Sequence, residues 1–249
     1  MKNTKFYLQA AMLLLPAFLS AQNVIPEPTQ YRPAKGQFVL TAAETKAFEA
    51  QDVLPGRVVQ CVISGSTPMD ADEAYHLKIT PDSVFIQSAT ATGAFRGKET
   101  LKQLLRSGKG TAKACVINDA PRYAWRGFML DESRHFFGKK KVKQLLDIMA
   151  SLRLNVFHWH LTDEPGWRIE IKKYPLLTQI GAKGNWHDPD APATFYTQDD
   201  IKEIVAYAAA RHIMVVPEFD MPGHATAACR AYPELSGGGE GRWKDFTFH

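Results

Sequence analysis

Residues 155–170 of this chain read NVFHWHLTDEPGWRIE, and the fold class can be inferred from this stretch outward. A short apolar strand runs directly into two histidines, two acids and a Pro-Gly turn. Because side chains alternate along a strand, Val156, His158 and His160 share one face, and Phe157 and Trp159 share the other. We expect the aromatic face to pack on helices and the histidine face to line the interior of a barrel.

The flanking sequence alternates between strand and helix patterns. Strands are expected over 126–131, 155–160 and 213–220, each rich in apolar residues. A helix is expected over 139–152, where apolar residues recur at helical spacing, and a second helix is opened by the capping-box pattern of residues 197–200. This order predicts βαβ units, so the fold class is α/β with a parallel sheet.

The preceding residues, 22–120, have a different pattern. Two alternating runs, 75–80 and 83–88, predict a hairpin, and a helix is expected over 92–105. This predicts a small α+β domain that ends at a turn near residue 120. Residues 121–249 then supply three strands, whereas a closed parallel barrel typically needs about 250 residues. We therefore expect an incomplete barrel and a chain that is the front part of a longer gene product.

Residues 1–21 resemble a cleaved secretory signal. Lys2 and Lys5 precede the apolar run 6–18, and Leu19-Ser20-Ala21 forms a small-residue exit. The pattern predicts an exported protein, periplasmic or extracellular, with no stable membrane span after cleavage. Removal of this segment takes two Lys from 30 basic residues and none from 26 acidic residues, which leaves a nearly neutral chain. Such a balance does not indicate a nucleic-acid partner.

Polar side chains gather where the three predicted strands end. In a parallel barrel the C-terminal strand ends form the active face. Burying this many ionisable groups without partners would cost several kcal/mol, on the order expected for unpaired buried polar groups, so a functional site is indicated. The residues at these ends are Asp131, His158, His160, Asp163, Glu164, Glu218, Asp220 and His224.

The residue types narrow the chemistry. Asp163 and His224 suit a carboxylate–imidazole pair, in which the acid fixes the ring tautomer and the ring tunes a third group. No G-x-S-x-G motif or neighbouring Cys offers a nucleophile for acyl transfer. A metal is conceivable because His158-x-His160 ends a strand, although acids crowd next to it. Carboxylates and a tryptophan in an exported protein favour sugar chemistry.

Several ordered motifs between residues 119 and 235 resemble those of family 20 glycoside hydrolases, the β-N-acetylhexosaminidases. The upstream α+β segment also resembles the N-terminal companion domain of that family. The motifs are WRGFMLD at 125–131 followed by RHF at 134–136, NVFHWHLTD at 155–163, GWRIEI at 166–171 and DMPGH at 220–224.

This resemblance implies a (β/α)8 barrel that removes terminal β-linked N-acetylglucosamine or N-acetylgalactosamine with retention. The nucleophile would be the 2-acetamido oxygen of the substrate, so the partner is a glycan that contains N-acetylhexosamine. No metal and no organic cofactor are implied.

By motif position, the resemblance also implies roles for individual residues. Asp163 and His224 would orient and tune the general-acid Glu. Arg126 would bind hydroxyl groups of the terminal sugar, with His160, Glu164 and Asp220 lining the same pocket. Simple alternation puts Arg126 and Asp131 on opposite faces, so a bulge or an early strand start would be needed to bring both to one pocket.

One element of the family pattern is missing. The resemblance implies an adjacent Asp-Glu pair after the third strand, and none occurs between His224 and His249. The pair Asp163-Glu164 belongs to the earlier motif. The fragment is therefore expected to be inactive alone, with the catalytic acid encoded downstream. A non-catalytic amino-sugar-binding protein and a metal-dependent barrel hydrolase remain as alternatives.

Overall fold

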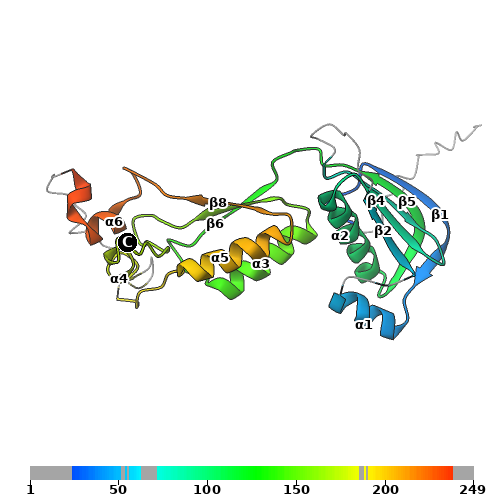
Figure 1. The fold of residues 1–249 in the computed structure, drawn as a ribbon, viewed down its shortest axis with the longest axis horizontal. Coiled ribbons are helices and arrows are strands. Elements are labelled where there is room, and N and C mark those ends of the chain that lie inside the picture. Colours follow the sequence, from blue (N-terminus) through cyan, green and yellow to red (C-terminus); the bar gives the residue numbers. More distant parts are fainter. Residues whose placement is uncertain are drawn as a thin grey trace, which may run out of the picture.

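A computed structural model describes residues 24–51, 54, 56–62, 72–184, 188 and 190–237. The expected signal segment, 1–21, lies outside these residues. Figure 1 shows two bodies, one built on a five-stranded sheet and one on a three-stranded sheet. The fold is mixed α/β, with an incomplete barrel preceded by an α+β domain, which confirms the predicted fold class.

The five-stranded sheet has the order β1-β5-β3-β4-β2, in which only β2 and β4 pair in parallel. The predicted hairpin is confirmed as β3 and β4, and the predicted helix as α2. Helix α2 covers one face of this sheet (Figure 1) and buries Leu101, Leu104 and Leu105 against it. The elements of this domain are β1 (Gln30–Val39), α1 (Ala42–Gln51), β2 (Val58–Val62), β3 (Tyr75–Ile79), β4 (Val84–Ser88), α2 (Ala91–Ser107) and β5 (Thr111–Asp119).

The three-stranded sheet has the order β6-β7-β8, and both pairs are parallel. Its strands and helices follow the predicted βαβ order, and their observed ends differ from the expected ones by at most two residues. The elements are β6 (Gly127–Asp131), α3 (Lys139–Ser151), β7 (Val156–His160), α4 (Leu176–Gln179), α5 (Gln198–Ala209), β8 (Met214–Glu218), α6 (Thr226–Ala231) and the 3₁₀ helix η2 (Pro233–Ser236).

Helices α3 and α5 pack side by side on one face of this sheet. The core between them contains Phe157 and Trp159 from β7, which are fully buried, as alternation predicts for that face. Helix α5 begins with the predicted capping box, in which Thr197 and Asp200 each bond the backbone N–H of the other. The two helices therefore hold β7 at the centre of the sheet.

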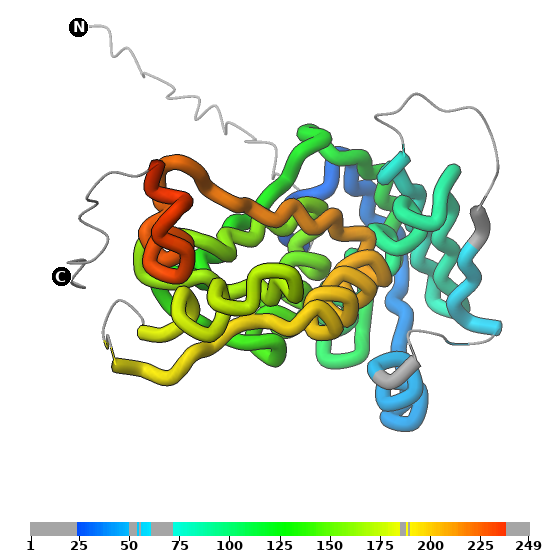
Figure 2. Tube along the Cα trace, turned by 60° about the vertical axis from the view of Figure 1, so that its left-hand side comes forward, coloured from blue at the N-terminus to red at the C-terminus, as the bar shows by residue number. Residues whose placement is uncertain are grey.

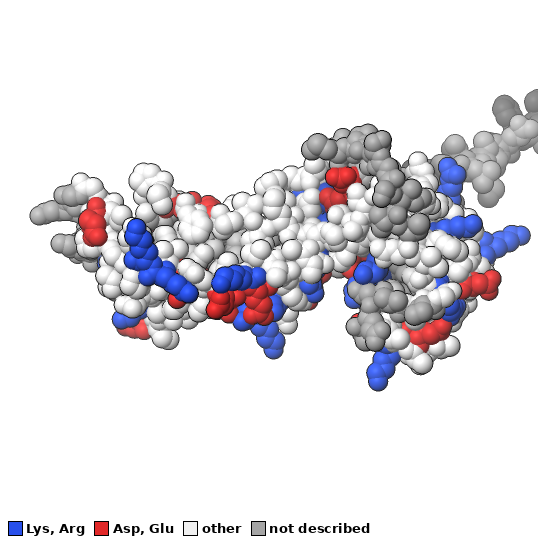
Figure 3. All heavy atoms as spheres, viewed as in Figure 1, with Lys and Arg blue, Asp and Glu red and all other residues white. Residues whose placement is uncertain are grey.

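The other face of this sheet carries exposed apolar side chains. Figure 3 shows that the surface over β6 and β8 has few charged groups. Met129 of β6 and Met214 of β8 are exposed there, in register with His158 and Val156 of β7. Within the described residues, no helix is long and apolar enough to cross a membrane.

The two domains meet at the N-terminal ends of the barrel strands. The carboxylate of Glu73, from the first domain, lies 2.5 Å from Arg126 at the start of β6 and 3.0 Å from Asn155 just before β7. It also lies 2.7 Å from Arg96 of α2, whose guanidinium donates to the carbonyl of His212 just before β8. One buried ion cluster thus joins the first domain to the base of all three strands.

Candidate active site

The C-terminal ends of the three strands lie at one level. The strand register pairs Asp131 with His160 and His160 with Glu218. Nδ1 of His160 lies 2.8 Å from Oε2 of Glu218, and Nε2 of His158 lies 2.5 Å from the same oxygen. The parallel sheet therefore gathers groups that are far apart in sequence along one edge.

Asp163 is the centre of the cluster, and its side chain is fully buried. Its Oδ2 lies 2.6 Å from Nη1 of Arg134 and 2.7 Å from Nε2 of His160. Its Oδ1 lies 2.9 Å from Nδ1 of His224 and accepts a 2.6 Å hydrogen bond from the backbone N–H of Glu164. Four donors thus surround one carboxylate, which is the number that its lone pairs accept.

His224 faces outward from this carboxylate. Its backbone has a φ of 53°, in the left-handed region, and its side chain is 54% exposed. Because an ionised carboxylate only accepts hydrogen bonds, the contact with Asp163 requires a proton on Nδ1 of His224. In the neutral ring Nε2 then remains as an acceptor on the exposed side. The structure thus brings together the two residues for which the sequence predicts a carboxylate–imidazole pair.

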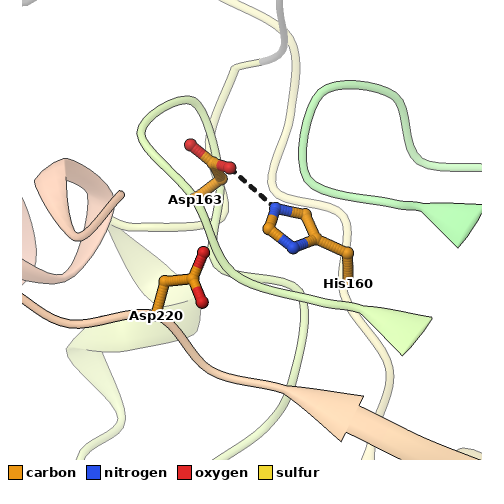
Figure 4. A group of neighbouring side chains, drawn as sticks. All are labelled: His160, Asp163 and Asp220. Atoms are coloured by element: carbon orange, nitrogen blue, oxygen red, sulfur yellow. Dashed lines mark hydrogen bonds and ion pairs between the residues drawn. The ribbon is translucent and has the colours of Figure 1, made fainter. Parts of the chain in front are cut away.

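Asp220 and Glu164 lie beside the pair. Figure 4 shows Asp163 and His160 pointing toward each other, and Asp220 on the neighbouring segment that follows β8. The backbone N–H of Asp220 donates a hydrogen bond of 3.3 Å to Oγ1 of Thr162. This bond connects that segment to the end of β7. The side chain of Glu164 is partly exposed next to Asp163.

The structure does not bring Arg126 to this cluster, so the proposed sugar contact of Arg126 needs correction. Arg126 precedes β6, while Asp131 ends it, and five residues of strand span roughly 17 Å. The Arg126 guanidinium instead bonds Glu73 and the carbonyls of Tyr123 and Arg153. No bulge is needed, because the two residues lie at opposite ends of the strand.

Arg134, which follows the other end of β6, reaches the cluster instead. The Asp131 carboxylate accepts hydrogen bonds from the backbone N–H groups of Ser133 and Arg134, each with a length of 3.0 Å. These bonds turn the loop back over the strand end. Nη1 of Arg134 then lies 2.8 Å from Oδ2 of Asp131 and 2.6 Å from Asp163. The signal in the sequence was the Asp at the strand end, because an Asp side chain often accepts the backbone N–H two residues on in an Asx turn.

A buried arginine supports the loops of the site from below. The guanidinium of Arg168 is fully buried and donates to backbone carbonyls of both flanking loops, and burial lowers its pKa to about 10. A Cβ on Gly166 would lie 2.4 Å from this guanidinium, so a larger residue at this position would displace it. The carbonyls are those of Glu132, Ser133, Ala182, Gly184 and Thr194.

Glu132 is a second buried group beneath the site. Its carboxylate accepts a 2.6 Å bond from the hydroxyl of Tyr196 and a 2.7 Å bond from the backbone N–H of Phe137. Burial raises the pKa of Glu132, and these hydrogen bonds only partly offset that effect. Glu132 and Arg168 together hold the loop that carries Arg134.

A cation site was one alternative for this cluster. Ligand atoms of His160, Asp163 and Asp220 lie within 4.8 Å of one another. However, both ring nitrogens of His160 already contact carboxylates, and the Arg134 guanidinium lies against the Asp163 oxygen that a metal would need. This geometry favours carboxylate–imidazole chemistry over metal ligation.

Comparison with known proteins identifies the family. Residues 123–247 match the catalytic domain of glycosyl hydrolase family 20, and residues 45–120 match domain 2 of the same family. A β-hexosaminidase of Porphyromonas gingivalis is 34% identical over 263 residues, which covers 92% of this chain and 34% of that protein. The chain thus spans about a third of the length of this relative.

Solved structures agree in fold. An N-acetyl-β-hexosaminidase of Streptomyces plicatus superposes with a TM-score of 0.75 at 34% identity, over 87% of this chain and 49% of that one. An exo-β-N-acetylglucosaminidase of Vibrio harveyi superposes with a TM-score of 0.74 at 32% identity, over 88% and 39%. On this evidence, and with the motif residues gathered at the C-terminal ends of β6, β7 and β8, the chain belongs to glycosyl hydrolase family 20.

Proposed function

We propose that this chain is part of an exo-acting β-N-acetylhexosaminidase, which releases terminal β-linked N-acetylglucosamine or N-acetylgalactosamine with retention. The observation that carries the proposal is the hydrogen bond between Asp163 and His224 at the rim of the barrel strands, with Arg134 on the other oxygen of Asp163. The relative from Vibrio harveyi was solved in complex with N-acetylglucosamine, which supports the same class of substrate.

The geometry supports a role for each group in this reaction. The exposed Nε2 of His224 is placed to hydrogen-bond a general-acid carboxylate, while buried Asp163 stabilises the charge that forms on the ring. Arg134 is 38% exposed, and its side-chain contacts with the described residues are made through Nη1, so its remaining N–H groups suit sugar hydroxyls. The substrate's acetamido oxygen acts as the nucleophile, and the general acid is a Glu that this stretch of sequence does not contain.

Hydrolysis of aryl glycosides by the protein expressed from its gene tests the proposal. We expect release of the aryl group from N-acetyl-β-glucosaminide and N-acetyl-β-galactosaminide, and none from the β-glucoside that lacks the acetamido group. The variant Asp163→Asn removes the anion that fixes His224, so kcat should fall by about 10²–10⁴-fold. Glu234→Gln, an exposed position on η2, is the matched control.

Two results would contradict the proposal. Equal cleavage of the β-glucoside would show that the acetamido group takes no part in the reaction. Binding of N-acetylglucosamine without turnover would instead support the non-catalytic sugar-binding alternative.

We also infer that the protein is exported, to the periplasm or out of the cell. The inference rests on residues 1–21, where two lysines precede an apolar run and a small-residue exit. Export suits an enzyme whose substrates are glycans outside the cytoplasm. N-terminal sequencing of the protein from fractionated cells should give a mature chain that starts near residue 22, and an intact Met1 in the cytoplasmic fraction would overturn the inference.

A further inference from the structure

Glu218 contacts the Asp163–His224 pair only through His160, and the proposed reaction does not use it directly. Its Oε2 lies 2.8 Å from Nδ1 of His160 and 2.5 Å from Nε2 of His158. The other nitrogen of His160, Nε2, lies 2.7 Å from Oδ2 of Asp163. The imidazole of His160, which is almost fully buried, therefore lies between two carboxylates.

This arrangement determines the protons on His160. A neutral imidazole carries one N–H group, while each ionised carboxylate can only accept a hydrogen bond. Both contacts are satisfied together only when both ring nitrogens carry protons. Burial by itself lowers the pKa of His160, but the hydrogen bonds to Glu218 and Asp163 outweigh it and raise the pKa above its usual value.

The protonated ring has a consequence for Asp163. Its Nε2–H donates to Oδ2, and Nη1 of Arg134 forms a 2.6 Å ion pair with the same oxygen, so two positively charged groups lie against it. The carboxylate cannot rotate without breaking both contacts. Its other oxygen, Oδ1, is therefore kept directed at Nδ1 of His224.

We propose that Glu218 is a positioning residue: it holds His160 with both ring nitrogens protonated, and His160 in turn fixes the Asp163 carboxylate that orients His224. The catalytic meaning of this chain of contacts rests on the proposed function, whereas the protonation of His160 does not. The other charged groups that face His160 are Asp131, Arg134 and Asp220, and His158 reaches it through Glu218.

The ring nitrogens can be observed directly by NMR. In uniformly ¹⁵N-labelled protein, long-range ¹H–¹⁵N correlations distinguish protonated from unprotonated histidine nitrogens, and the His160→Gln variant assigns the signal. Near pH 7 we expect both nitrogens of His160 to be protonated. In Glu218→Gln the midpoint of His160 titration should fall by about 1–3 pH units, because an opposite charge in contact is lost.

Two control variants separate this role from a general structural one. Glu234→Gln removes an equivalent charge at an exposed position on η2 and should leave the His160 signals unchanged. His158→Gln removes the second partner of Glu218 but keeps the contact between Glu218 and His160, so both nitrogens should stay protonated. If Glu218→Gln does not fold, the wild-type spectrum and its pH series still decide the question.

Failure of this inference is distinguishable from failure of the proposed function. An unprotonated nitrogen on His160 near pH 7 in the wild type, or an unchanged titration in Glu218→Gln, overturns the positioning role even if the protein cleaves aryl glycosides. If the NMR result holds and the enzyme is active, Glu218→Gln should lower kcat with little change in KM, because sugar contacts are untouched. A doubly protonated His160 in a protein that hydrolyses no aryl glycoside would support the contact between Glu218 and His160 and would refute the enzymatic function.

Discussion

Removal of the Glu73 side chain should destabilise the barrel segment, although Glu73 belongs to the first domain. The Arg96 guanidinium is only 2% exposed and the Arg126 side chain 14% exposed, and both contact the Glu73 carboxylate. Breaking a buried ion pair by removing one partner costs about 3–5 kcal/mol. Both arginines keep hydrogen bonds to backbone carbonyls, so we expect a loss near the lower end, about 3 kcal/mol, in Glu73→Ala.

The tryptophans make this effect measurable. All five Trp residues of the chain lie after residue 120, so tryptophan fluorescence reports only on the barrel segment. With a urea dependence of about 2 kcal/mol per molar, the unfolding midpoint should fall by about 1–2 M. Glu49→Ala, at an exposed position on α1, removes the same charge from the same domain and should leave the midpoint unchanged.

The stabilisation should also depend on pH in a defined direction. Burial tends to raise the pKa of Glu73, but Arg96 and Arg126 outweigh it and hold the pKa below 4.5. The contribution is therefore present above about pH 4.5 and is lost as pH falls through the folded-state pKa. Equal fluorescence midpoints for Glu73→Ala and Glu49→Ala near pH 7 would refute the idea that this carboxylate couples the two domains.

Three further changes test the support of the site. Gly166→Ala places a Cβ 2.4 Å from the Arg168 guanidinium and should cost about 1–3 kcal/mol in a thermal melt, whereas Gly223→Ala meets nothing within 4 Å and should be neutral. Because the pKa of Glu132 is raised in the folded state, the stability of the wild type should fall as pH rises above 4.5, and Glu132→Gln should remove this fall. Equal pH slopes of the two proteins in urea titrations would contradict this. Thr197→Ala deletes the cap of α5 and should lower the free energy of unfolding by about 0.5–2 kcal/mol, and no change would show that the cap is dispensable.

Much of the fold and part of the site could be predicted from local patterns. Periodicity indicated each βαβ element, and the polar residues at the strand ends indicated that Asp163 and His224 would meet. That inference holds because parallel strands place their C-terminal ends at one edge, so no tertiary detail is needed. Figure 2 shows the same convergence for the loops, with the red helix α6 beside the yellow-green segment that carries α4.

The arginines could not be placed by alternation alone. Arg126 and Arg134 lie on either side of β6, and a motif match does not say which end of a strand reaches the pocket. Arg134 reaches it only because the Asp131 carboxylate turns the loop, which is a side-chain to backbone contact. Arg168 is buried by loops that come together from distant parts of the chain, a feature without a local sequence signal.

The contacts of Arg168 have a consequence for how this protein can vary. Its guanidinium binds main-chain oxygens, at 2.7 Å from Ala182, 2.9 Å from Ser133 and 3.0 Å from Gly184. Every amino acid supplies such an oxygen, so most substitutions in these loops keep the contacts. An inserted or deleted residue shifts an oxygen away from the guanidinium and leaves a charge buried. At the positions that only supply an oxygen to Arg168, such as Ala182 and Ser133, the side chains are therefore expected to vary while the lengths of the loops stay fixed.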